Sequence, residues 1–106
     1  MNDEVSEAEL LRAKLNAETA IIGWMELQRP HAAGKVIQVG ATLDLVDVAA
    51  QLTTDNGAQI DAWIKSGEIE AVQDAQAAEW VVVNQPLWAI VISPWVLVQN
   101  KPESVA

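Results

Sequence analysis

Three residues in the first third of the chain have side chains that could do acid–base chemistry: Glu18, Glu26 and His31. A histidine titrates near neutral pH, and a neighbouring carboxylate can orient its ring and stabilise its charged form. Neither a nucleophile nor an oxyanion-binding motif accompanies them. A small enzyme or ligand-binding protein that uses these three residues is therefore kept as the alternative function, and no residue is assigned as catalytic.

Other patterns that carry chemistry are absent from the sequence. The chain has no cysteine, which excludes disulfides, thiolate metal sites and cysteine nucleophiles. Its glycines are scattered singly, so no phosphate-binding loop is formed, and no serine nucleophile elbow is present. Four aspartates (Asp44, Asp47, Asp55 and Asp61) lack the alternating pattern with a central glycine of a calcium loop. We expect neither a cofactor nor a metal, and interpret these aspartates as helix caps and solvated surface.

The charge of the chain argues against nucleic acid. Six basic residues face fifteen acidic ones, for a net charge of −9, which repels phosphate backbones. The segment from Leu45 to Val72 is similar to a helix-turn-helix, and a DNA-binding role is therefore the third alternative. Between Ala41 and Gln85, however, eight carboxylates accompany a single basic residue, Lys65. We therefore expect that the protein has no nucleic-acid partner.

The only candidate for a membrane span is the apolar stretch from Trp80 to Val98. Polar residues and prolines interrupt it at Asn84, Gln85, Pro86, Ser93 and Pro94, and a spanning helix does not tolerate such a cluster. The N-terminus is acidic and lacks the basic and apolar regions of a signal peptide. We expect a soluble cytoplasmic protein without a membrane partner.

The first part of the chain is predicted to be helical. Ser6 and Glu9 form a capping box, which begins a helix from Glu7 to Ala20. Gly23 interrupts it, and a second helical piece starts at Trp24. Pro30 would lose a helical hydrogen bond, so this piece is expected to kink or end near Gln28.

Later helices and short strands follow from periodicity and stop signals. A helix from Leu43 to Thr53, with Thr42 as its cap, precedes a turn and a helix that directs Ile60, Trp63 and Ile64 inward and ends at Gly67. Another helix begins at Gln73 or Asp74. The predicted strands are Val36–Val39, Ile69–Val72 and the long apolar run Leu87–Gln99, with a bend or bulge at Ser93–Pro94.

These elements predict a single α+β domain over residues 1–106. Four or five short helices would pack on a small, mainly antiparallel sheet of about three strands, of which Leu87–Gln99 is the longest. Residues 1–5 and 100–106 are expected to be disordered tails.

The apolar run has more apolar surface than so small a sheet can bury, which indicates a subunit interface. Trp88, Ile90, Ile92 and Trp95 are its candidate residues, because Trp is enriched at interfaces. The predicted partner is a second copy of the chain, in a homodimer, or another protein. The leading hypothesis for function is a non-catalytic interaction or regulatory protein that acts through this Trp-rich surface.

Several phrases of the sequence resemble a known family. Trp24-x-Glu-Leu-Gln, Leu43-Asp-Leu-Val-Asp-Val-Ala and, most specifically, Pro94-Trp-Val-Leu-Val-Gln are similar to segments of small bacterial proteins catalogued as domain of unknown function 2288. The resemblance runs from about residue 10 to residue 99. It implies a bacterial cytoplasmic protein and a single domain, and it assigns no activity, cofactor or site residue.

Overall fold

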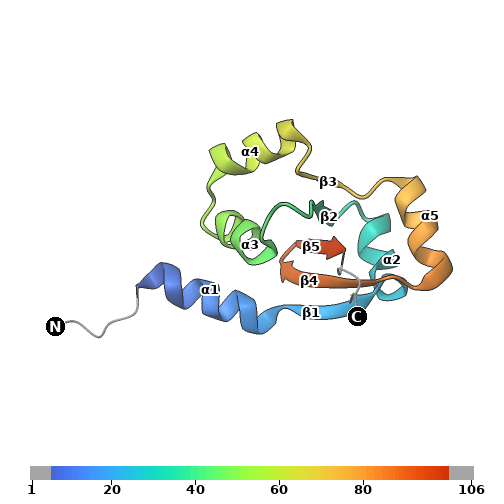
Figure 1. The fold of residues 1–106 in the computed structure, drawn as a ribbon, viewed down its shortest axis with the longest axis horizontal. Coiled ribbons are helices and arrows are strands. Elements are labelled where there is room, and N and C mark those ends of the chain that lie inside the picture. Colours follow the sequence, from blue (N-terminus) through green and yellow to red (C-terminus); the bar gives the residue numbers. More distant parts are fainter. Residues whose placement is uncertain (1–5, 101–106) are drawn as a thin grey trace.

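A computed structural model describes residues 6–100, which form one mixed five-stranded sheet with helices on both faces (Figure 1). The elements follow one another as α1 (Glu7–Glu18), β1 (Ala20–Gly23), α2 (Trp24–Ala32), β2 (Val36–Val39), α3 (Leu45–Thr53), α4 (Gly57–Ser66), β3 (Ile69–Ala71), α5 (Asp74–Val83), β4 (Pro86–Ile92) and β5 (Trp95–Asn100). The α+β class and the strands β2 and β3 are as predicted. The tails were predicted at 1–5 and 100–106; Asn100 belongs to β5, so the second prediction was wrong at that residue, and 1–5 and 101–106 lie outside the described residues.

The sheet has more strands than expected and is mixed, because one pair of neighbours is parallel. Its order is β1-β4-β5-β2-β3, and β2 pairs with β5 in parallel while the other neighbours are antiparallel. The prediction of about three strands was too low. The parallel pair arises because β2 and β5 are joined by a long crossover that includes three helices, a connection that sequence periodicity does not reveal.

The predicted long strand Leu87–Gln99 is in fact two strands. β4 and β5 form a hairpin in which Ile92 lies opposite Trp95, and residues 93–94 make the turn between them. The predicted bend at Ser93–Pro94 is correct in place but understated in size. Pro94 lacks the N–H that a central strand must donate, so the chain turns there instead of continuing the ladder.

The first helix is shorter than predicted because residues 20–23 pair with β4 as a strand. Ile21 lies opposite Trp88 and Ile22 opposite Leu87. The Trp24 N–H donates to the Gln85 carbonyl at 3.0 Å and continues the same ladder. Two adjacent β-branched residues favour this extended pairing over helix once β4 is available, and the predicted helix to Ala20 was wrong at its end.

Helix α2 also differs from expectation, because it continues through Pro30 to Ala32. A proline removes one helical hydrogen bond, that of its own nitrogen to the Glu26 carbonyl. The Ala33 N–H still donates to the Arg29 carbonyl at 3.2 Å, and the Lys35 N–H to the Pro30 carbonyl at 2.9 Å. The predicted end near Gln28 was therefore wrong, since the bonds beyond the proline are kept.

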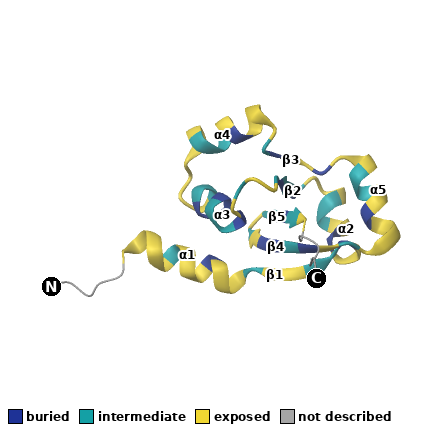
Figure 2. Ribbon diagram, viewed as in Figure 1, coloured by how far each residue is buried: buried dark blue, intermediate teal, exposed yellow. Residues whose placement is uncertain are grey.

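Side chains that alternate along β4 and β5 supply two separate cores, one on each face of the sheet. The first core lies under α1, α3 and α4 and includes Ile90 and Leu97 together with Val48 of α3. The second core lies under α2 and α5 and includes Leu87, Val98 and the two tryptophans Trp24 and Trp80, whose rings are inclined at 59° to each other. Figure 2 shows that most of α1 and much of α5 are exposed, so the sheet and α3 hold much of the buried surface.

Side-chain caps define several helix starts. The Ser6 hydroxyl accepts the Glu9 N–H at 3.1 Å, as the capping box predicts. Asp44, rather than Thr42, caps α3 by accepting the Val46 N–H at 3.0 Å. Gly67 ends α4 in the left-handed conformation, with φ of 80°.

Gly23 provides a local prediction, because the Asn84 side chain occupies the place of a Cβ. A Cβ at Gly23 would lie 2.7 Å from Asn84 Oδ1, and that oxygen accepts the Met25 N–H at 2.8 Å at the start of α2. Gly23→Ala should displace the amide and lower the free energy of unfolding by about 1 kcal/mol, the size of a lost cap. In an Asn84→Gly background the same change should cost almost nothing. Urea unfolding measures both; an equal loss in the two backgrounds would contradict this account.

Candidate functional site

The three acid–base residues do not meet in the structure. His31 is partly buried near the end of α2, with its ring edge against Trp24 at 5.1 Å between centroids. Among the described residues, the carboxylate within 4 Å of its Nε2 is Asp74 of α5, at 3.9 Å, which is longer than a hydrogen bond. Glu18 and Glu26 are exposed and make no ion pair with His31 within residues 6–100. The geometry gives this trio no acid–base pair.

Within the described residues, no group of three or more His, Asp or Glu side chains could hold a metal ion. Two basic side chains of residues 6–100, Arg12 and Lys65, form ion pairs at the surface. Arg12 of α1 bridges Asp44 and Asp47 at 3.4 and 3.0 Å, which ties α1 to α3. Lys65 and Asp61 pair at 3.0 Å on the outer side of α4, the helix that would read DNA in the helix-turn-helix interpretation.

All four candidate interface residues lie on one face of the sheet. Trp88, Ile90 and Ile92 alternate along β4, and Trp95 sits opposite Ile92 on β5. The hairpin therefore brings both tryptophans to the same side, which is the side covered by α1, α3 and α4. Ile90 is 0% exposed, so it belongs to the core and offers no surface to a partner. Trp88, Ile92 and Trp95 are half-buried.

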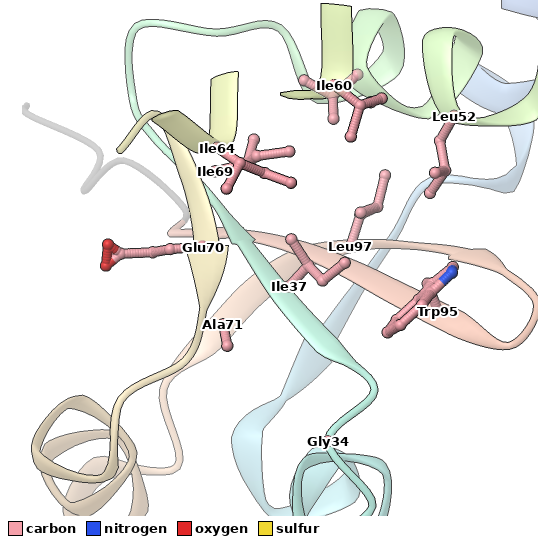
Figure 3. A pocket seen from close by; sticks show the side chains of 11 residues that line it. Gly34, Ile37, Leu52, Ile60, Ile64, Ile69, Glu70, Ala71, Trp95 and Leu97 are labelled. Carbon is pink, nitrogen blue, oxygen red and sulfur yellow. The ribbon is translucent and has the colours of Figure 1, made fainter. Parts of the chain in front are cut away.

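A cleft of about 250 Å³ opens on this same face, between α3 and α4 on one side and β2, β3 and β5 on the other. Figure 3 shows Ile60 and Ile64 of α4 directed toward Ile37 of β2 and Leu97 of β5, with Leu52 and Trp95 at the right side of the view. Glu70 borders the cleft, but its carboxylate points away from it. The cleft walls are therefore almost wholly apolar.

The cleft stays open because α4 is attached by one side only. Trp63 is the residue of α4 that is buried, in the first core, and α4 contacts α3 and β3 rather than lying flat on the sheet. Ile60 is half-buried and Ile64 is 56% exposed. The prediction that Ile60, Trp63 and Ile64 all point inward is correct for Trp63, partial for Ile60 and wrong for Ile64, which forms the rim of the cleft.

The charges around the cleft are uneven. From α3 to the end of β3 the chain carries five carboxylates and one lysine. At the other end of the cleft, the Lys35 ammonium lies 5.2 Å from the centre of the Trp95 ring, a cation–π arrangement that holds the ring in place. The stretch from α3 to β3, which borders the cleft, is therefore acidic in sum, although Asp47 pairs with Arg12 and Asp61 with Lys65.

Sequence reasoning found one residue of this site, Trp95, and missed the others. Ile37, Leu52 and Ile60 read as ordinary core positions of a strand and two helices. The available signal was in α4. This helix of ten residues has three large apolar side chains, more than a small sheet has area to cover. Which of the three would remain uncovered depends on the angle of α4, and that angle is set by tertiary packing.

The fold and this site define a class of protein: an α+β domain with a helix-lined apolar cleft on one face of its sheet and no assembled catalytic group among residues 6–100. The chain matches the family described as "Protein of unknown function (DUF2288)" over residues 10–100. It belongs to this family, and the resemblance noted in the sequence is confirmed.

A solved structure supports the fold. The NMR solution structure of PA1075 from Pseudomonas aeruginosa has 39% sequence identity to the chain and a TM-score of 0.77, and the match covers 100% of this chain and 95% of that one. Among the curated proteins, no match to the chain is found. Within residues 6–100, no helix has both the length and the apolar character to cross a membrane.

Proposed function

We propose that this protein is a non-catalytic interaction protein that binds a basic polypeptide segment, and that the segment anchors apolar side chains in the cleft between α4 and the sheet. The observation that carries the proposal is an open, apolar-walled cleft in a domain of only 106 residues. Filling such a cleft is favourable in free energy, because the partner's apolar side chain and the apolar cleft walls are removed from water together.

The cleft suits a side chain of a polypeptide better than a small molecule. Pockets that bury a drug-sized ligand have volumes of about 300–1,000 Å³ and a few convergent polar groups that fix its orientation. This cleft is smaller, at about 250 Å³, and the one charged side chain at its border, Glu70, points away. A polypeptide would obtain its orientation from contacts outside the cleft, with the acidic stretch from α3 to β3.

Charge selects the kind of polypeptide. The stretch from α3 to β3, which borders the cleft, carries five carboxylates and one lysine, and the whole chain has a net charge of −9. A basic segment is attracted to such a surface and an acidic one is repelled, chiefly through the association rate. We also propose a bacterial cytoplasmic setting, with which the absence of cysteine agrees.

Selection from a random displayed peptide library tests the proposal. We expect the selected peptides to carry a net positive charge and at least one large apolar residue, and expect Ile64→Gln to weaken their binding by about tenfold, as the loss of one apolar anchor contact does. Val82→Gln on α5 is the matched control: Val82 is 82% exposed and does not line the cleft. Its affinity should stay at the wild-type value in titration calorimetry.

Two results would contradict the proposal. Selected peptides without basic residues would remove the charge argument. Peptides that bind Ile64→Gln as tightly as the wild type, with amide shifts that map outside α4, β2 and β5 in NMR spectra, would remove the cleft.

A further inference from the structure

Strand β1 forms one edge of the sheet and is paired on one side only. Within residues 6–100 its neighbour is β4, and the strand order ends with it. Figure 1 shows β1 along the lower border of the molecule, where α1 leads into it almost along the same line. Its outer side is therefore a row of backbone groups that can pair with another strand.

The register shows which groups face outward. The Trp24 N–H donates inward to Gln85, and alternate residues of an antiparallel ladder point the same way, so Ile22 and Ala20 also face β4. The N–H and C=O groups of Ile21 and Gly23 then point away from the sheet. The Ile21 side chain, which lies opposite Trp88, is itself 48% exposed.

The two edges of this sheet are protected to different degrees. Proteins guard an exposed edge with short strands, charges, prolines or bulges. The opposite edge, β3, has three residues with the charged Glu70 at its centre. β1 consists of Ala-Ile-Ile-Gly, without a charge or a proline. β1 is also short, with four residues, but it lacks the charge that β3 has, and its two β-branched residues favour pairing with a further strand.

We propose that β1 is a homodimer interface, in which β1 of a second copy pairs antiparallel to it about a twofold axis at Ile21. Antiparallel pairing of identical strands is self-complementary: Ile21 exchanges both of its hydrogen bonds with Ile21 of the second copy. The same register lets the Gly23 N–H donate to the carbonyl of Thr19 of the second copy. Other occupants of the edge would have to bring a strand of their own.

The charge of the chain does not prevent this approach. The four residues of β1 are uncharged, and the register sets Glu18 opposite Trp24 of the second copy rather than opposite its carboxylate. The apolar contact of Ile21 with its symmetry mate, beside Trp88 of each copy, is what the pairing buries.

This interface is independent of the proposed function, because the cleft lies at β2, β3 and β5, toward the other edge of the sheet. A dimer through β1 would carry its two clefts on opposite ends of one continuous sheet. A partner with two basic segments could then bind with the added strength of bivalence.

Single cysteines test the register directly, because the natural chain has none and any disulfide must join two copies. The Cα atoms of a hydrogen-bonded antiparallel pair lie about 5.5 Å apart, inside the range of about 4.4–6.8 Å that a disulfide spans. Ile21→Cys should therefore cross-link rapidly under mild oxidation. Ile64→Cys, at a similarly exposed position on α4, should not. Equal cross-linking of the two variants, or none at position 21, would overturn the proposal.

The mass in solution gives the second readout. Light scattering after size exclusion should report twice the mass of the chain for the wild type. Ile21→Lys should give a folded monomer, because it sets two like charges directly opposite each other on adjacent strands. Ile64→Lys, with the same change of charge, should remain a dimer, and amide NMR spectra verify that both variants fold. A monomeric wild type, or dissociation by both variants alike, would contradict the β1 interface.

Discussion

Replacement of Trp24 by alanine is expected to lower the free energy of unfolding by about 3–5 kcal/mol, the usual cost of truncating a buried Trp. Trp24 is 1% exposed in the second core and packs against Trp80 at 5.2 Å and His31 at 5.1 Å between ring centroids. Three separate elements, α2, α5 and the sheet, meet at this side chain. Since a domain of this size has a total stability of about 5–15 kcal/mol, the variant should be close to unfolded at elevated temperature.

Urea unfolding followed by far-ultraviolet circular dichroism measures this effect without reliance on the tryptophan signal. Trp95→Ala is the matched control, because Trp95 is only half-buried at the cleft. It should lower the free energy of unfolding by a clearly smaller amount. If Trp24→Ala lowered the free energy of unfolding no more than Trp95→Ala does, the expectation from the burial of Trp24 would be contradicted.

The second large effect is expected at Ile90. Ile90→Ala should lower the free energy of unfolding by about 2–5 kcal/mol, because it leaves a cavity in the first core under α3. Its neighbour Val91 points to the other face of β4 and is 60% exposed, so Val91→Ala should change stability by no more than about 0.5 kcal/mol.

The Ile90 comparison also separates a core role from an interface role. Truncation of a core residue lowers the free energy of unfolding and leaves the mass in solution unchanged. This is the result we expect for Ile90→Ala, because Ile90 is buried. If Ile90→Ala instead dissociated the protein with little loss of stability, the position of Ile90 inside the first core would be contradicted. Unfolding curves and light scattering on the same samples distinguish these results.

Local signals were sufficient where the chain's own neighbours decide the structure. The Ser6 cap, the helix end at Gly67 and the bend at Ser93–Pro94 all depend on a few adjacent residues, and each is found at its predicted place. The strands β2 and β3 were also predictable, since short β-branched segments after a glycine have few alternatives.

Distant contacts decided the elements that were mispredicted. Ala20–Gly23 continues a helical pattern in the sequence and becomes a strand because β4, more than sixty residues later, supplies its hydrogen bonds. Pro30 was expected to kink or end α2 near Gln28, but the helix continues to Ala32, with Leu27 packed in the second core before the proline and His31 against Trp24 after it. Such choices cannot be read from a window of neighbouring residues.

The cleft was unpredictable for the same reason. Its residues have the types of an ordinary core, and their sequence positions are those of buried faces. What makes them a site is the offset of α4, which leaves Ile64 at the surface while Trp63 remains buried. Trp95 was identified for its residue type alone, and its place beside Ile37 and Leu97 came from the pairing of β5 with β2.

The position of β5 has a consequence for the way the protein is made. Among residues 6–100, β5 is the last strand, yet it occupies the centre of the sheet, between β4 and β2. Until it has left the ribosome, β1 with β4 and β2 with β3 are two separate pairs with no shared hydrogen bonds. The sheet can therefore close only after β5 has been made, because Trp95–Asn100 is the strand that joins the two pairs.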